Sequence, residues 1–319
     1  MGRRPARAAP VPPVTWRDGV HLTGTPIWCD ARRRRDICFV SSVDRVGRGA
    51  HGQLIATPLT LALLGDGGGG ADLAVPVRKR FTLGTLRLEL IPSGRGAGAA
   101  ALLVDLGGRS TLYAGAVRGA KIASCDPAEV RSCDALVVHA PFGEEHHRFP
   151  RLDEAIAKTA AWAKAELAAE RRPVVFCDTA LDGLEIATEL AARGAPVSAG
   201  RQIRELAARA KLAGVTTPGK EPRVVVWLDS DHAGLAKALA GKRFATALAS
   251  GRAIEGGDGY DTSFVWASAA DRKTLLAWIA SASAREVFVT GPCADAIALA
   301  VGPKARVVGP PRQMALFAP

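Results

Sequence analysis

The sequence lacks the features that would place it in a membrane or in an oxidising compartment. No apolar run reaches the roughly 18 residues that a membrane-spanning helix needs. The six cysteines include no Cys-x-x-Cys pair, so neither a zinc site nor a disulfide framework is indicated. The N-terminal residues are basic but lead into prolines instead of an apolar segment, which argues against a secretory signal. We therefore expect a cytoplasmic protein without a membrane partner, whose cysteines are small, reduced core residues.

Acidic residues are in deficit. The chain has 42 Lys and Arg against 31 Asp and Glu, which gives a formal net charge of +11. This balance favours an anionic partner, although net charge does not determine fold. With 319 residues and 48% hydrophobic content, the chain is long enough for two compact lobes. Residues 1–14, rich in Arg, Pro and Ala, are predicted to form a disordered basic arm.

The region 15–151 shows mainly the pattern of strands. Its one predicted helix begins at Pro58, because Thr57 is a favourable N-cap and proline a favourable first residue, and it ends at Gly65. Short apolar runs bounded by turn residues predict the strands. They are Gly19–Leu22, Pro26–Asp30, Ile37–Val40, Leu86–Ile91, Ala101–Leu106, Ser110–Ala114 and Ala135–His139.

The region 152–252 changes to an alternation of helices and strands, which predicts βαβ units and a parallel sheet. The strands are Pro173–Cys177, Val224–Leu228 and Phe244–Leu248, and the helices are Leu152–Glu170 and segments near 180–193, 201–212 and 232–240. Residues 253–309 are predicted to return to the first domain, and residues 310–319 to form a tail. The returning elements are helix Asp271–Ser281, strand Glu286–Thr290 and helix Cys293–Val301.

Six segments, spread in order over nearly the whole chain, carry a resemblance to a known family. They are Phe39–Pro58, Leu90–Ala100, Tyr113–Ala116, Cys133–Gly143, Val265–Asp271 and Val289–Pro292. Together they resemble the motifs of metallo-β-lactamase-fold nucleases of the β-CASP type, and the ligase-associated DNA exonucleases in particular. The resemblance implies an α/β protein with an αββα metallo-β-lactamase sandwich, formed by 15–151 and 253–309. A Rossmann-like β-CASP lobe, 152–252, would be inserted between these two parts.

The resemblance also implies a loss, because other residues stand where this family carries its metal ligands and their partners. These positions hold Ser41, Val43, Arg45, Val46, Arg95, Ala116, His139, Ala269 and Gly291. Hydroxyl, alkyl and guanidinium groups do not hold the divalent ions that activate water in this fold. We therefore predict no metal, no cofactor and no catalytic residue. The chain would be an inactive relative that binds nucleic acid or a repair or processing partner without hydrolysis.

Six arginines are the candidate contacts to nucleic acid: Arg32, Arg33, Arg34, Arg35, Arg45 and Arg95. The last two occupy former ligand positions. A guanidinium restores the positive charge that a metal centre would supply and forks onto phosphate oxygens, yet it delivers no hydroxide. The alternative is that these residues result from drift in an Arg-rich chain. DNA is expected rather than RNA, with a DNA ligase or an active β-CASP paralogue as a possible protein partner.

Other interpretations remain. The chain could be an active exonuclease or phosphodiester hydrolase with an unconventional site built from Asp30, Asp44 and His139. Two further segments resemble metal motifs. Asp229–His232 is better explained as a helix cap, and Glu144–His147 as solvated surface.

The tail contains Gln313-Met314-Ala315-Leu316-Phe317, which resembles the short Gln-x-x-Leu-Phe peptide that docks bacterial repair proteins on the replication sliding clamp. Leu316 and Phe317 would fill an apolar pocket, and Gln313 would make directional hydrogen bonds. The alternative is a tail packed on the fold itself.

Overall fold

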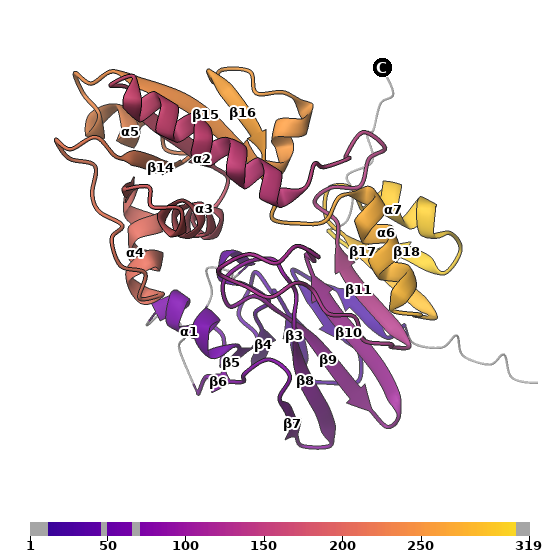
Figure 1. Cartoon of the computed structure of the whole chain (residues 1–319). Helices are drawn as coiled ribbons and strands as arrows, with labels where there is room; N and C mark the ends of the chain where they lie inside the picture. Colours follow the sequence, from indigo (N-terminus) through magenta and orange to yellow (C-terminus); the bar gives the residue numbers. More distant parts are fainter. Residues whose placement is uncertain (1–11, 46–49, 66–70, 311–319) are drawn as a thin grey trace, which may run out of the picture.

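The computed structural model describes residues 12–45, 50–65 and 71–310, which form two lobes built on three sheets (Figure 1). The basic arm, Val46 and the clamp-like residues Gln313, Leu316 and Phe317 lie outside the described residues, so the expectations for them stay predictions. Among the described residues, no helix combines the length and the apolar character needed to cross a bilayer.

The first lobe contains two sheets that pack face to face. The first sheet consists, in order, of β1 (Val14–Trp16), β2 (Val20–Leu22), β3 (Ile27–Cys29), β4 (Ile37–Phe39), β5 (Gln53–Ala56) and β6 (Leu73–Ala74). The second consists of β18 (Ala305–Val307), β17 (Glu286–Thr290), β11 (Ala135–His139), β10 (Arg109–Gly115), β9 (Ala100–Leu106), β8 (Leu86–Pro92) and β7 (Arg80–Leu83). A shared core lies between them and includes Phe39 and Ile55 from the first sheet and Leu90 and Leu102 from the second.

Helices cover the outer face of each sheet. On the second sheet, α6 (Arg272–Ser281) and α7 (Ala294–Val301) bury Leu275, Ile279 and Ile297 against β11 and β17. On the first sheet, α1 (Pro58–Leu64) packs Leu61 and Leu64 on a smaller apolar cluster. The prediction for α1 is confirmed. The Thr57 hydroxyl accepts from the Thr60 amide at 3.0 Å, and Gly65 ends the helix with a φ of 66°.

The second lobe is a parallel sheet with helices on both faces, as the alternating pattern predicted. Its strand order is β13 (Val197–Ala199), β14 (Val224–Leu228), β12 (Arg172–Cys177), β15 (Phe244–Ser250) and β16 (Thr262–Val265). One face packs on α2 (Leu152–Ala168), α3 (Ala180–Ala192) and α4 (Arg201–Arg209), and the other on α5 (His232–Ala238). Since helices cover both faces of the sheet, side chains on both sides of each strand are buried, and the sequences of these strands are continuous apolar runs.

The predicted boundary at residue 252 is wrong for this lobe. The strand β16, Thr262–Val265, pairs with β15 in the parallel sheet, so the lobe extends to Val265. The loop before β16 is rich in Gly and Asp, and the strand itself is four residues long, too short for a clear periodic pattern. The helix α2 also ends earlier than predicted, at Ala168, because Glu170 adopts a left-handed φ of 56°.

The two lobes are joined by an apolar contact. Leu63 of α1 and Ala97 pack against Leu181 and Leu184 of α3 and Leu206 of α4. Figure 1 shows α1 lying directly below α4, at the point where the lobes meet. The candidate site lies on the side of the first lobe that this contact turns toward the second lobe.

Candidate functional site

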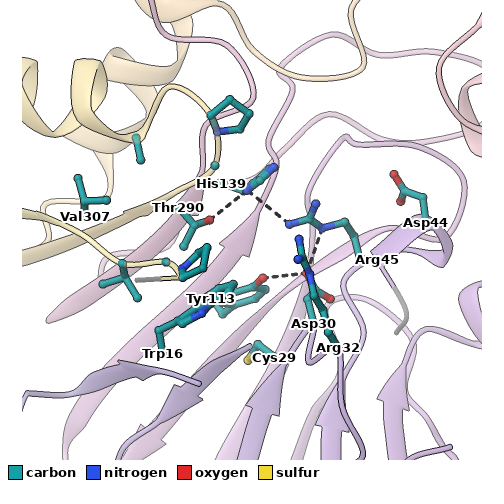
Figure 2. Close-up of a pocket in the computed structure, with 16 residues that line it drawn as sticks. Trp16, Cys29, Asp30, Arg32, Asp44, Arg45, Tyr113, His139, Thr290 and Val307 are labelled. Atoms are coloured by element: carbon teal, nitrogen blue, oxygen red, sulfur yellow. Dashed lines mark hydrogen bonds and ion pairs between the residues drawn. The ribbon is translucent and has the colours of Figure 1, made fainter. Parts of the chain in front are cut away.

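The ends of several first-lobe strands meet on the side that faces the second lobe, and two neighbouring cavities open there. Both are lined by Asp44, Arg45 and His139. The larger cavity, about 620 Å³, extends toward Trp16 and Val307 (Figure 2). The smaller cavity, about 190 Å³, lies toward the second lobe and is also lined by its residues Asp178, Thr179 and Asp182.

The structure brings together nearly all positions that the family resemblance singled out. The smaller cavity is lined by Ser41, Arg45, Arg95, Ala116, His139 and Ala269, and the larger one by Arg45, His139 and Gly291. Val43 packs half-buried on the apolar contact between the lobes. Segments from Ser41 to Gly291 therefore converge on one site, as the order of the motifs predicted.

The residues at this site do not fit a divalent metal. The alanines offer no donor atom, and both guanidinium groups are cations. The Ser41 hydroxyl donates its proton to the Asp30 carboxylate at 2.6 Å. A dinuclear centre needs carboxylate, imidazole or thiolate ligands in a closed set, which this arrangement does not supply.

Asp30 holds the loop that begins at Ser41. Its carboxylate accepts from the Ser41 amide at 2.8 Å, the Ser41 hydroxyl at 2.6 Å and the Tyr113 hydroxyl at 2.8 Å. Nε of Arg45 lies 3.7 Å away. Burial raises the pKa of Asp30, while Arg45 and these hydrogen bonds lower it in part. Asp30 also has a left-handed φ of 48°, a strained conformation for a non-glycine residue that often marks a functional site.

His139 presents a hydrogen-bond donor to the cavities. Its Nδ1 faces two donors, the Thr290 hydroxyl at 3.0 Å and Nη2 of Arg45 at 3.4 Å (Figure 2). Burial and, after it, the Arg45 guanidinium lower the pKa of His139 to about 3, so the ring is neutral. Because a guanidinium only donates, we assign the ring proton to Nε2. No acceptor for this N–H exists among the described residues.

Gly291 makes room for this histidine. Its φ of 101° favours glycine, and a Cβ at this position would lie 2.9 Å from Cε1 of His139 and 2.8 Å from the carbonyl oxygen of Ala140. A side chain at 291 and the imidazole at 139 in its present place therefore exclude each other. The glycine at 291 thus permits the position of the His139 ring.

Arg95 differs from Arg45 because both ends of its guanidinium are occupied. It is buried, and it donates to Asp44 at 2.7 Å and to Asp182 of the second lobe at 2.8 Å. Burial opposes its charge, but the carboxylates of Asp182 and Asp44 outweigh this and raise the pKa of Arg95. Burial likewise opposes the ionisation of Asp44, but Arg95 outweighs it and lowers the pKa of Asp44. Arg95 thus links the two lobes and has no free edge for a phosphate.

A second buried ion pair, which sequence reasoning missed, reinforces this link. Arg118 donates to both oxygens of Glu185 on α3, at 2.7 and 2.9 Å. The indole N–H of Trp266 donates to the same carboxylate at 2.8 Å. Nothing local in the sequence signals this pairing, because the partners come from three distant segments.

The run of four arginines does not converge on the site. Arg32 lines the larger cavity, while Arg33 and Arg34 are exposed. Arg33 pairs with Asp18 at 3.2 Å, and Arg35 lies 3.9 Å above the ring of Trp28. Of the six candidate arginines, Arg32 and Arg45 are therefore the two that line the larger cavity.

The helix-cap interpretation of Asp229–His232 is confirmed. Asp231 caps α5 and accepts from the Gly234 amide at 3.0 Å. Asp229 accepts from Arg252, Tyr260 and His232, so the carboxyl edge of the parallel sheet is closed by its own side chains.

His146, His147 and Glu255 form a group with the side chains of metal ligands. Nδ1 of His147 accepts from the amides of Gly143 and Glu144, both at 3.0 Å. The ring proton is therefore on Nε2, which lies 3.2 Å from Glu255. A metal at Nε2 would have to displace this proton while both amides still point at Nδ1, so the arrangement suits a hydrogen bond and not a metal ligand.

Comparison with known proteins supports the fold of this chain and identifies no family. No family model matches the chain, and no curated protein matches it. Among solved structures, it is similar to a protein of unknown function from Enterococcus faecalis V583, with 13% identity and a TM-score of 0.56. The match covers 87% of this chain and 80% of that one. At this identity the likeness shows that the two share a mixed α/β fold.

Proposed function

We propose that this chain is a catalytically inactive relative of β-CASP exonucleases, which binds nucleic acid through the larger cavity without hydrolysing it. The helix–sheet–sheet–helix layering of the first lobe and its parallel second lobe support a metallo-β-lactamase sandwich with an inserted β-CASP lobe. The convergence of the degenerate ligand positions on one site supports the same assignment.

One observation carries the proposal. The larger cavity presents the Arg45 guanidinium and the Nε2–H of His139 where the family would present metal ions. Both groups donate, and Arg32 adds a further positive charge on the same cavity. A phosphate oxygen accepts from such donors, and charge-assisted hydrogen bonds of this kind are short and strong. Trp16 adds an aromatic wall, on which an unpaired base can stack.

Arg95 is left out of this contact, in contrast to the expectation from sequence. Its charge is balanced by Asp44 and Asp182. The preference for DNA over RNA rests on the family resemblance, as do a DNA ligase or an active paralogue as partners. The sliding clamp as a partner rests on the resemblance of residues 313–317 to a clamp-docking peptide.

The alternative of an active hydrolase finds less support. The carboxylate of Asp30 is taken up by three donors and that of Asp44 by Arg95 and Ser42. Nδ1 of His139 faces a guanidinium instead of a water-sized space. A general base must reach the proton that it removes, and none of the three has that freedom.

The test is binding without cleavage. A fluorescein-labelled single-stranded DNA oligonucleotide with a 5′-phosphate is titrated with the full chain, with Mn²⁺ present, over a range of salt concentrations. We expect affinity to fall steeply with salt, because counterions are released, and the recovered oligonucleotide to be intact on a denaturing gel.

The Arg45→Ala variant should bind about tenfold more weakly, and its salt slope should be shallower by about one unit. Arg201→Ala is the charge-matched control, since Arg201 is exposed on the second lobe and pairs with Glu205. If both variants lose the same affinity for the oligonucleotide, binding depends on the net charge of the chain and not on the cavity.

A further inference from the structure

A second surface, on the first lobe, is lined by acidic and apolar residues, whereas the larger cavity is lined by Arg32 and Arg45. It is a broad, open hollow between α7, β18 and the turn at Glu144 and Glu145, with a volume of about 920 Å³. We call it the α7–β18 surface. Its floor includes Ala298, Leu299 and Val307, and its acidic residues are Glu144, Glu145 and Asp295.

Exposed apolar side chains gather on this surface. Four large hydrophobic residues are exposed in the described part of the chain, and two of them, Leu299 at 84% and Val307 at 41%, lie here. Leu299 points away from the core that Ile297 of the same helix enters. Burying a leucine side chain is favourable, so an outward leucine beside other apolar groups marks a contact surface.

The charge of the hollow selects its partner. Three carboxylates line it against one basic residue, Arg272, in a chain whose net charge is +11. The guanidinium of Arg272 donates to the carbonyl groups of Gly143 and Ala296, so it is turned toward the protein. An acidic rim repels the phosphates of nucleic acid and attracts Lys and Arg. The partner is therefore a protein segment.

The hollow also adjoins the proposed binding cavity. Val307 lines both, and β18 is the last strand of its sheet on that side among the described residues. An edge strand offers backbone groups to an extended peptide. A segment docked here would lie next to nucleic acid held at Arg45.

We propose that the α7–β18 surface docks a basic peptide segment of a partner protein, with a leucine-like anchor on Leu299 and Val307 and with Arg or Lys side chains on Glu144 and Glu145. This interaction is separate from the binding of nucleic acid and does not depend on it.

The probe is a fluorescein-labelled peptide of alternating Arg and Leu, with Arg-Ser and Glu-Leu repeats as matched peptides. The full chain, freed of nucleic acid, should bind Arg-Leu and neither matched peptide. Leu299→Ser should weaken binding about tenfold, while Phe244→Ser, which removes an exposed hydrophobic side chain from the second lobe, should leave it unchanged. Glu144→Gln with Glu145→Gln should weaken binding several-fold and reduce its salt dependence.

Three outcomes would overturn the proposal. Equal binding of the Arg-Leu peptide by the Leu299→Ser and Phe244→Ser variants would remove the apolar anchor. A dimer in sedimentation velocity that Leu299→Ser dissociates would make the surface an interface between two copies of this chain. Tighter peptide binding after deletion of residues 1–11 would show that the chain's own basic arm is the occupant. Unchanged melting temperatures confirm that the variants are folded.

Discussion

The two arginines at positions where the family resemblance would place metal ligands have opposite surroundings. Arg95 is buried between Asp44 and Asp182, and it joins the two lobes. Arg45 is partly exposed, makes a long contact with Asp30 and a weak one with His139, and keeps a free edge on the larger cavity. The same residue type thus forms a structural ion pair on one side of the site and offers free donors on the other.

This difference separates two roles for an arginine at this site. The carboxylates around Arg95 still need a cation, and a guanidinium satisfies them without any capacity to activate water. On the Arg45 side, Asp30 already accepts from three other donors and Asp44 pairs with Arg95, so the Arg45 guanidinium stays available to a ligand. Arg95 therefore bears on stability and Arg45 on binding, and the two roles are separable by mutation.

The largest expected effect is on stability at Arg95. Arg95→Met leaves Asp44 and Asp182 buried without their cation, which should cost about 3–5 kcal/mol in the free energy of unfolding. Urea unfolding measures this, with Arg201→Met as the control, because its exposed pair with Glu205 is screened by water and should contribute little to stability. Adding Asp182→Asn to Arg95→Met should recover part of the loss, because the pair is coupled. A loss as small as that of the control would contradict the structural role.

The next effect is a dependence of stability on pH. The pKa of His139 is about 3 in the folded chain and near the ordinary histidine value of 6.5 when unfolded. Between these values the unfolded chain binds a proton that the folded chain does not, so the free energy of unfolding should fall as pH falls from 6.5 toward 3.

Replacing His139 by Gln should remove about 3 kcal/mol of the stability change between pH 6.5 and pH 4. Urea midpoints at a series of pH values measure it. Asp44 also favours folding through its lowered pKa, but its contribution is lost only near and below the ordinary aspartate value of 3.8. Parallel pH profiles for the two proteins would show that His139 is protonated in the folded state.

A smaller effect on stability is expected at Arg45. Arg45→Ala removes a contact of 3.7 Å to a carboxylate that keeps three other donors, so the free energy of unfolding should change by less than about 1 kcal/mol. Binding of the oligonucleotide should nevertheless fall. A variant that unfolds as readily as Arg95→Met would remove the distinction between the two arginines.

The smallest expected effect is on activity. Placing His, His, Asp and His at positions 41, 43, 45 and 46 should not produce metal-dependent cleavage. Arg95, Ala116, His139, Ala269 and Gly291 would still withhold ligands and partners, and a metal site needs both shells complete. Release of labelled nucleotides, dependent on Mn²⁺ and blocked by a chelator, would show that the later motifs are misaligned.

Local signals in the sequence predicted much of the fold. The cap at Thr57 and the apolar runs of β12 and β14 need few partners to be recognised, and each was placed within a residue or so. The short strands β13, β16 and β18 were missed, because three or four residues form a strand only when a neighbouring strand pairs with them.

The site was predictable in its position and less so in its chemistry. Motif order alone placed Ser41, Ala116 and Ala269 around one cavity. The pairing of Arg95 with Asp182, 87 residues away in the second lobe, depends on how the lobes dock, and no local pattern encodes it. The same holds for Arg118 and Glu185, and for the steric fit between Gly291 and His139.

The central claim is that guanidinium groups have taken the place of a dinuclear metal centre. Its most direct test is the metal content of the full chain, purified without chelators, dialysed against Zn²⁺ and Mn²⁺, desalted and measured by inductively coupled plasma mass spectrometry. The account predicts far less than one equivalent of either metal per chain, with no change in an Arg95→Met sample. A full dinuclear complement that survives desalting would contradict it.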